Sequence, residues 1–222
     1  MAGSLDATAM IAEMELMKQV VLHTARILAP HNRQDYYYEQ LLRLADDDYF
    51  FETYQVIAWA ALRLRPRRIM EIGTRNGGSL VQLLSMYHRY DGMQVVCFDV
   101  WREIGSPRSV RRNLRRLSIP ADMVEFIRGD SRQTIPAFVQ QRPDAHFDYV
   151  LVDGGHEREV ARTDLQNVAD LVDPGGILIF DDIGQESYQL IDVWREFQAA
   201  RREQFDWYEK LWRKGVAWAI RR

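Results

Sequence analysis

Cysteine and long apolar runs are scarce in this chain of 222 residues. The single cysteine, Cys97, cannot form a disulfide within the chain, and the N-terminus lacks an export pattern, so we expect a cytoplasmic protein. No apolar run approaches the roughly 18 residues that span a bilayer, so no membrane partner is expected. A net charge of −3 makes nucleic acid an unlikely general partner.

Short apolar runs alternate with amphipathic segments from residue 66 onward. Each run is nearly continuous in apolar residues, as is typical of strands buried on both faces. The amphipathic segments carry apolar residues at helical spacing, and 173-DPGG-176 is expected to end one helix and turn the chain. Such alternation predicts βαβ units in a parallel sheet. The expected strands cover residues 68–72, 95–99, 123–127, 147–153 and 177–182.

The C-terminal segment departs from this alternation. Residues 205–211 and 216–220 are both typical of strands, and only four residues separate them. So short a connection requires a hairpin of antiparallel strands. The predicted fold is therefore α/β: a doubly wound, mostly parallel sheet of seven strands with a C-terminal antiparallel hairpin.

The first 65 residues differ in pattern and are predicted to form a helical region, followed by the α/β domain at 66–222. Met10, Met14, Met17, Val21 and Leu28 have the spacing of an amphipathic helix that packs on the core or on a second subunit, which indicates a possible homodimer. A second helix is expected at 35–45, and after 46-DDD-48 the apolar segment 49–65 is expected to be a third. The aromatic start of that segment is close enough to the first strand to act as a lid. Its candidate substrate contacts are Tyr49, Glu52 and Tyr54.

A glycine-rich turn follows the first expected strand in 69-IMEIGTRNGGSL-80. Glycines let a ligand approach the backbone, and doubly wound folds bind ligands at this edge of the sheet. Glu71 lies inside the end of a buried strand, where a carboxylate needs hydrogen-bond donors. Arg75 takes the place of the second glycine of the dinucleotide fingerprint, which disfavours a nicotinamide cofactor.

The E-x-G-x-x-x-G-G pattern of this turn resembles the cofactor motif of class I S-adenosylmethionine (SAM)-dependent methyltransferases. Two further segments agree with this resemblance, because Asp99 ends the second strand and 128-RGDSRQTIP-136 follows the third. The resemblance implies that these segments hold SAM through its ribose and adenine. The implied cofactor-binding residues are Glu71, Gly73, Thr74, Arg75, Asn76, Gly77, Ser79, Asp99, Val100, Gly129, Asp130, Ser131 and Asp153.

Three acids are expected to meet at the carboxyl ends of two neighbouring strands. Asp153 lies in 151-LVDGGHERE-159, and Asp181 and Asp182 lie in 179-IFDDIG-184. Carboxylates held close together repel unless protons or a cation intervene, and oxygen ligands suit a hard ion such as Mg²⁺. The structural alternative is that the same acids cap a helix or bind backbone amides.

This arrangement resembles the metal-dependent O-methyltransferases, of the catechol and caffeoyl-CoA types and of the type that acts on macrolide sugars. The resemblance implies that Asp153, Asp181 and Asp182 are the metal ligands. His156 stands where the catechol type has a lysine, and D-x-x-H is closer to the macrolide-sugar type. His156 is the candidate base, with metal ligation or a structural role as alternatives, and Asp153 is the other candidate catalytic residue.

The expected function is SAM-dependent, divalent-metal-assisted O-methylation of a small-molecule hydroxyl, on a sugar moiety or another natural product. Two alternatives remain open. The five arginines of 108-RSVRRNLRRL-117 could contact phosphates in an RNA methyltransferase, although such a run is usually a solvated helix face. The chain could also bind SAM without turnover, as a scaffold or partner subunit.

Overall fold

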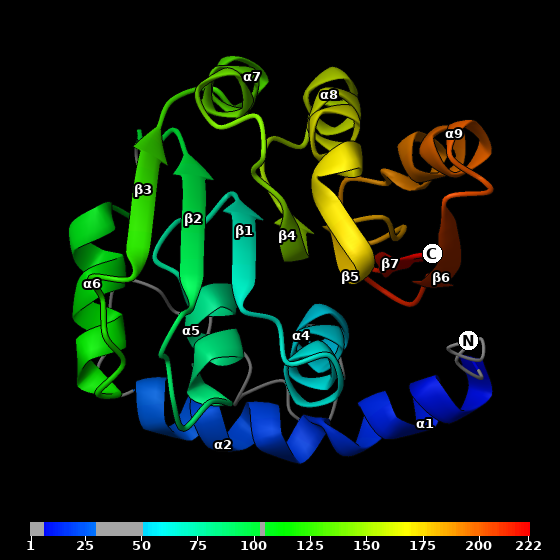
Figure 1. The fold of residues 1–222 in the computed structure, drawn as a ribbon. Coiled ribbons are helices and arrows are strands. Elements are labelled where there is room, and N and C mark those ends of the chain that lie inside the picture. The colour runs from blue at the N-terminus through cyan, green and yellow to red at the C-terminus, as the bar shows by residue number, and fades with distance from the viewer. Residues whose placement is uncertain (1–6, 30–50, 103–104) are drawn as a thin grey trace.

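A seven-stranded sheet forms the centre of the computed structural model, which describes residues 7–29, 51–102 and 105–222 (Figure 1). The strand order is β3-β2-β1-β4-β5-β7-β6, with β7 antiparallel to both β5 and β6. The predicted fold is therefore confirmed, including its terminal hairpin. The strands are β1 (Arg68–Ile72), β2 (Gln94–Asp99), β3 (Val124–Arg128), β4 (Phe147–Val152), β5 (Val172–Asp181), β6 (Phe205–Lys210) and β7 (Val216–Arg221).

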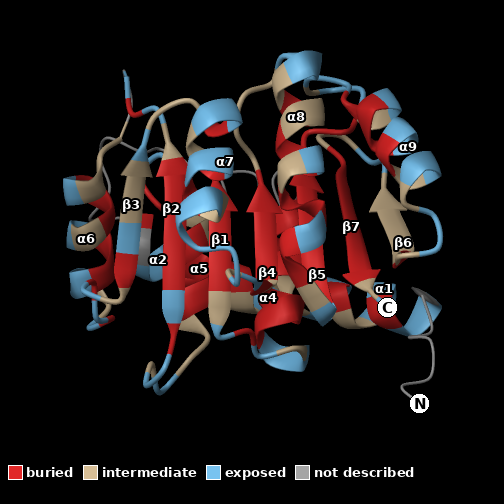
Figure 2. Cartoon of the chain, turned by 45° about the horizontal axis from the view of Figure 1, so that its top comes forward, coloured by how far each residue is buried: buried red, intermediate tan, exposed pale blue. Residues whose placement is uncertain are grey.

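Helices cover both faces of the sheet, and Figure 1 shows α7, α8 and α9 on the face opposite α4 and α5. Successive strand residues alternate between two apolar clusters, so that Ile69 packs on one face and Met70 on the other. Figure 2 shows the buried strands between more exposed helices. The helices are α1 (Ala7–Leu16), α2 (Lys18–Leu28), α4 (Phe51–Arg63), α5 (Gly78–Ser85), α6 (Pro107–Arg116), α7 (Ser131–Gln141), α8 (Arg158–Val168) and α9 (Ile191–Ala200), with a 3-10 turn η2 (Ala169–Leu171).

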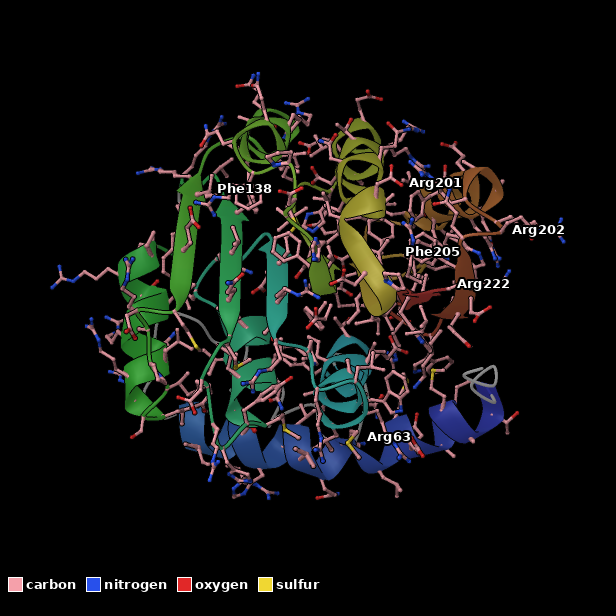
Figure 3. The ribbon with its side chains drawn as sticks, in the orientation of Figure 1. Arg63, Phe138, Arg201, Arg202, Phe205 and Arg222 are labelled. Atoms are coloured by element: carbon pink, nitrogen blue, oxygen red, sulfur yellow. The ribbon has the colours of Figure 1, made fainter. Side chains whose placement is uncertain are left out.

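The described N-terminal helices pack against the sheet domain. Met10, Met14 and Val21 are buried in the same apolar cluster as the fully buried Ile57 of α4. Glu13 of α1 accepts a hydrogen bond from Trp59 at 3.0 Å and forms an ion pair with Arg63, both of α4. Figure 3 shows Arg63 between the two helices. This packing places α4 beside the carboxyl end of β5.

Three local expectations need correction or lie outside the described residues. The first expected helix is two helices, α1 and α2, with Met17 between them. The 173-DPGG-176 segment lies within β5, where the β4–β5 register shifts between Phe147 and Tyr149, so four residues are accommodated as an irregularity of the strand. The expected helix at 35–45 and its neighbours 46–50 lie outside the described residues. None of the described helices is long and apolar enough to cross a membrane.

Candidate functional site

A cavity of about 1100 Å³ opens at the carboxyl ends of β1, β2, β4 and β5. The strand order reverses between β1 and β4, and doubly wound sheets bind ligands at such a switch point. The cavity volume lies slightly above the usual range for ligand pockets, roughly 300–1,000 Å³. Nine of the predicted site residues line it: Gly73, Arg75, Asp99, Val100, Gly129, Ser131, Asp153, His156 and Asp182.

The glycine turn brings the ends of β1 and β4 into contact. Gly73 has a φ of +88°, and a Cβ there would lie 1.8 Å from the carbonyl oxygen of Asp153. Gly77 has a φ of +81° and precedes α5, and a Cβ there would lie 2.8 Å from Val110 of α6. Both positions therefore require glycine for backbone conformation and for space.

Other residues of the turn are buried and support it without lining the cavity. Asn76 Oδ1 accepts a hydrogen bond from Ser109 Oγ at 2.7 Å, and the Asn76 carbonyl accepts one from Asn113 Nδ2 at 3.1 Å. These bonds fix the turn to α6. Thr74 is also buried. Direct contact of Thr74, Asn76, Gly77 and Ser79 with a cofactor stays a prediction.

Glu71 is buried at the end of β1, as its position in the sequence predicts. Ser79 Oγ donates a hydrogen bond to Glu71 Oε1, whereas Oε2 has no hydrogen-bond partner among the described residues. Burial raises the pKa of Glu71 to about 7, against the opposing effect of Ser79. The carboxyl group is thus close to its titration midpoint at neutral pH.

Asp99 connects the end of β2 to the glycine turn. Its Oδ2 accepts a hydrogen bond from the Arg75 N–H at 2.6 Å, and its Oδ1 accepts one from the Trp101 N–H at 2.7 Å. Trp101 Nε1 in turn donates to the Arg75 carbonyl at 2.9 Å. Each carboxylate oxygen keeps a lone pair that can face the cavity. An acid held in this way can accept hydrogen bonds from a diol such as a ribose.

The segment after β3 divides between the cavity and the start of a helix. Gly129 and Ser131 line the cavity, whereas Asp130 is the N-cap of α7. The Asp130 carboxylate accepts a hydrogen bond from Arg132 N–H at 3.0 Å and also pairs with the Arg132 guanidinium. That pairing keeps the pKa of Asp130 below its usual value. A contact of Asp130 with a cofactor stays a prediction.

Asp153, His156 and Asp182 converge at one side of the cavity. Each offers one ligand atom, and these three atoms all lie within 4.8 Å of one another. His156 Nε2 lies 2.9 Å from Asp182 Oδ2 and 4.0 Å from Asp153 Oδ1. Asp182 has a left-handed φ of 63°, which is unusual for a residue other than glycine and occurs often at functional sites.

Asp181 has different neighbours from the other two acids. Its Oδ1 accepts a hydrogen bond from Thr53 of α4 at 2.5 Å, and its Oδ2 lies 3.3 Å from Lys214 Nζ. Lys214 Nζ also lies 3.0 Å from Asp182 Oδ1. Asp181 therefore lies beside the group formed by Asp153, His156 and Asp182, but its carboxylate contacts Thr53 of α4 and Lys214. Its role as a metal ligand stays a prediction.

The surroundings of Asp153 and Asp182 shift the pKa values of the two carboxyl groups in opposite directions. Burial and the charge of Asp181 raise the pKa of Asp153 well above its usual range, although part of its side chain is exposed. Burial also acts to raise the pKa of Asp182, but contacts with His156 and Lys214 outweigh it and lower the pKa. Asp182 is therefore ionised at neutral pH, and a cation beside Asp153 would favour its ionised form.

The donor atoms fit a divalent cation. Opposite ligands of an octahedral Mg²⁺ are about 4.2 Å apart and adjacent ones about 3.0 Å apart, given bond lengths of 2.0–2.1 Å. The separations of His156 Nε2 from the two carboxylates, 2.9 and 4.0 Å, are close to these values, so His156 would be a third ligand in the alternative to its role as base. Carboxylate ligands also suit Mn²⁺.

Several cavity residues could not be found from local sequence patterns. Tyr188 stacks on His156 with ring centroids 3.6 Å apart, and Lys214 enters from the β6–β7 hairpin. Neither residue belongs to a motif, and a basic residue in a hairpin is common. Arg102, Glu186 and Ser187 also line the cavity.

The predicted substrate contacts before β1 do not line the cavity. Glu52 and Tyr54 are buried instead, and Tyr49 lies outside the described residues.

Residues 70–183, slightly more than half of the chain, match a family model described as a methyltransferase domain. A comparison with curated protein sequences gives no match. Solved structures of methyltransferases share the fold at low sequence identity. An O-methyltransferase from Bacillus cereus in complex with SAH has a TM-score of 0.62 and 16% identity, over 93% of this chain and 100% of that one.

Two further solved structures are similar to this chain to a comparable degree. An O-methyltransferase from Streptomyces achromogenes, involved in tomaymycin synthesis and solved with SAM, has a TM-score of 0.60 and 17% identity, covering 95% of each chain. A methyltransferase from Podospora anserina bound to SAH has a TM-score of 0.61 and 16% identity, over 100% of this chain and 98% of that one. At these identities the likeness establishes a common fold.

Proposed function

Because the chain belongs to a family of methyltransferase domains, we propose that it transfers a methyl group from SAM to a hydroxyl oxygen of a small molecule, assisted by a divalent cation. One observation carries this proposal: the glycine turn and the Asp153–His156–Asp182 group open into the same cavity. A methyl donor and a metal-bound acceptor could therefore lie side by side. The structural relatives bound to SAM or SAH support the choice of cofactor.

The residues of three strand ends would hold SAM. Asp99, fixed by two backbone N–H groups, would accept hydrogen bonds from the ribose hydroxyls. Gly129 and Ser131 would border the adenine, and the cationic methionine end of SAM would lie close to the buried Glu71 and favour its ionised form. The glycine at 73 leaves room for the cofactor to approach the backbone.

The acids of β4 and β5 would orient the acceptor. When bound, SAM would supply the methyl group, and a divalent cation would lower the pKa of the acceptor hydroxyl. Asp153 and Asp182 would hold that cation, with Asp181 beside them. His156 would take the hydroxyl proton as the oxygen–carbon bond forms, while the carbon–sulfur bond breaks and its electron pair stays on sulfur. Holding the two reactants together contributes much of the acceleration.

We propose a sugar moiety or another natural product as the acceptor. The D-x-x-H arrangement of Asp153 and His156 supports this choice through its resemblance to the macrolide-sugar enzymes. The structural similarity to an O-methyltransferase involved in tomaymycin synthesis also supports this choice. The RNA alternative depends on the α6 arginines, which have less support because none of them lines the cavity and an exposed row of this kind is usually a solvated helix face: Arg108, Arg112, Arg115 and Arg116.

The test is a methyl-transfer screen over hydroxylated natural products with labelled SAM. We expect labelled product with Mg²⁺ or Mn²⁺, loss of product with EDTA, and restoration when the ion is added back. Asp153→Ala should abolish turnover while leaving SAM binding measurable by calorimetry. Product formation that is unaffected by EDTA would rule out the cation, and absence of SAM binding would rule out the whole proposal.

We further propose a cytoplasmic homodimer that forms through the N-terminal helices. The single cysteine supports the compartment. Large apolar side chains on α1 and α2 remain exposed, with Leu16 at 71% and Ile27 at 43%, and such side chains are frequently covered by a partner. Light scattering on the wild type and on Leu16→Asp, with Leu211→Asp of the hairpin as the control, tests the assembly. A wild-type monomer would refute it.

A further inference from the structure

Lys214 brings an ammonium group into the acidic site from the turn between β6 and β7. Its Nζ lies 3.0 Å from Asp182 Oδ1 and 3.3 Å from Asp181 Oδ2, and only 15% of its side chain is exposed. Both acids are themselves buried, at 2% and 5% exposure. Two adjacent carboxylates in so little water need a nearby positive charge. Lys214 provides one that belongs to the chain itself.

Close backbone packing holds Lys214 in this place. The Lys214 carbonyl accepts hydrogen bonds from Gly184 N–H at 2.5 Å and from Ser187 Oγ at 3.0 Å. A Cβ on Gly184 would lie 2.1 Å from the Arg213 carbonyl oxygen, so the loop after β5 and the hairpin turn touch through backbone. Gly215 N–H also donates to the buried Glu52 of α4 at 3.1 Å. The position of Lys214 is therefore fixed relative to β5.

The two oxygens of Asp182 have different partners. Lys214 Nζ lies 3.0 Å from Oδ1, whereas His156 Nε2 lies 2.9 Å from Oδ2. One contact on Oδ1 leaves Oδ2 facing the proposed cation. Partners that hold a metal-ligating carboxylate through its second oxygen commonly determine its orientation.

We propose that Lys214 is a positioning residue for the cation site: it holds Asp182 by Oδ1, and Asp181 beside it, so that Asp182 Oδ2 faces Asp153 and His156. This inference rests on the proposed cation-assisted function. The choice of side chain agrees with it, because only three of the 29 basic residues are lysines. A compact ammonium can contact two carboxylates at once in a small space, where a planar guanidinium needs more room.

The experiment measures Mn²⁺ binding to the full chain by electron paramagnetic resonance, in the presence of SAH and without turnover. Lys214→Met should weaken Mn²⁺ binding by roughly 10–100-fold, the usual effect of losing a partner of a metal ligand. Lys214→Arg, which keeps the charge, should weaken it less. Lys210→Met is the matched control, because Lys210 pairs with Glu15 of α1 outside the cavity, and it should bind Mn²⁺ as the wild type does.

The outcomes separate this inference from the proposed function. If the wild type binds no Mn²⁺, the cation-assisted function fails. If the wild type binds it and Lys214→Met binds equally or more tightly, Lys214 is only a neutralising charge and the positioning role is refuted. SAH affinity and thermal stability, measured for each variant, detect a general loss of structure. If Lys214→Met does not fold, Lys214→Arg decides: unchanged Mn²⁺ affinity and unchanged kcat would refute the positioning role.

Discussion

Gly73 and Asp153 touch through their backbones, because a Cβ on Gly73 would lie only 1.8 Å from the Asp153 carbonyl oxygen. The Asp153 N–H also donates to the Ile72 carbonyl at 3.0 Å, which links the same two strand ends. The proposed cofactor turn and the proposed cation ligand therefore form one rigid unit. A change in the glycine would displace the acid, although the two residues are eighty positions apart in the sequence.

We expect Gly73→Ala to lower the free energy of unfolding by about 3 kcal/mol or more, which is at the upper end of the usual range for single substitutions. The positive φ and the overlap with the Asp153 carbonyl both contribute to this cost. Gly92→Ala is the matched control, since its φ is +70° but nothing lies within 4 Å of the new Cβ. It should cost only the conformational part, about 1–2 kcal/mol. Urea unfolding of both variants gives the comparison, and equal losses would show that the contact is unimportant.

Glu71 should make stability depend on pH around neutrality. Its pKa is raised by burial from 4.5 in the unfolded chain to about 7 in the folded one, so the folded state favours the protonated form. The stabilisation is present below about pH 4.5 and is lost as the pH rises through 7. Relative to Glu71→Gln, the free energy of unfolding of the unliganded wild type should fall by roughly 3 kcal/mol between pH 4.5 and 8.

Denaturant titrations of both proteins across this range test the expectation. Comparison with the glutamine variant removes the contribution of the other buried carboxyls, such as Asp164 with its pKa of about 6. A difference between the two proteins that stays constant with pH would show that folding does not change the pKa of Glu71.

The Asp99 carboxylate should be needed for both the turn and the cofactor. In Asp99→Asn one oxygen becomes an NH₂ group, which cannot accept the N–H of Arg75 or of Trp101. A hydrogen bond to a charged group contributes about 1.5–3 kcal/mol, so we expect SAM affinity to fall by roughly 10–100-fold in calorimetry.

Asp130→Asn should be compared with Asp99→Asn, because it tests whether the Asp130 carboxylate also contacts the cofactor. Asparagine is also a good N-cap, so α7 should remain stable. If Asp130 acts only as the cap seen in the structure, SAM affinity should be nearly unchanged. An equal loss in both variants would instead assign Asp130 to adenine binding, whereas unchanged affinity in Asp99→Asn would contradict the proposed ribose contact.

The sheet and the strand-end acids could be predicted because they depend on local pattern. Apolar runs locate the strands, and parallel strands bring their carboxyl ends to one edge, so Asp153 and Asp182 were expected to meet. Lys214 could not be predicted, because its position depends on backbone contact between Gly184 and Gly215. Likewise, the bond from Thr53 to Asp181 depends on how α4 packs against β5. Side chains that reach a site across tertiary contacts leave no local signal.

The 173-DPGG-176 segment carries a clear local signal, but its place in the structure also depends on the sheet. Its residues are typical of a turn, yet β5 starts before them at Val172 and pairs with Phe147, while regular pairing resumes at Ile177. The sheet accommodates the turn residues as an irregularity at its edge, where they are partly exposed. These four residues have no partner in the β4–β5 register, and Gly175 has a left-handed φ of +78°, so the local turn preference persists as an irregularity within the strand.

The role of His156 can be separated from that of the acids by measuring binding and turnover in the same variant. As the proton acceptor, it should contribute roughly 10²–10⁴-fold to the rate. His156→Ala should therefore lose this factor in kcat while Mn²⁺ affinity stays within about threefold of wild type, since Asp153 and Asp182 remain. Asp182→Asn, which removes a carboxylate ligand, should lower both kcat and Mn²⁺ affinity.

If His156→Ala loses Mn²⁺ affinity as strongly as Asp182→Asn, then Nε2 is a third metal ligand. In that case the proton acceptor must be another group. Tyr188→Ala, which removes the ring stacked on His156, should lower kcat less than His156→Ala because the imidazole remains.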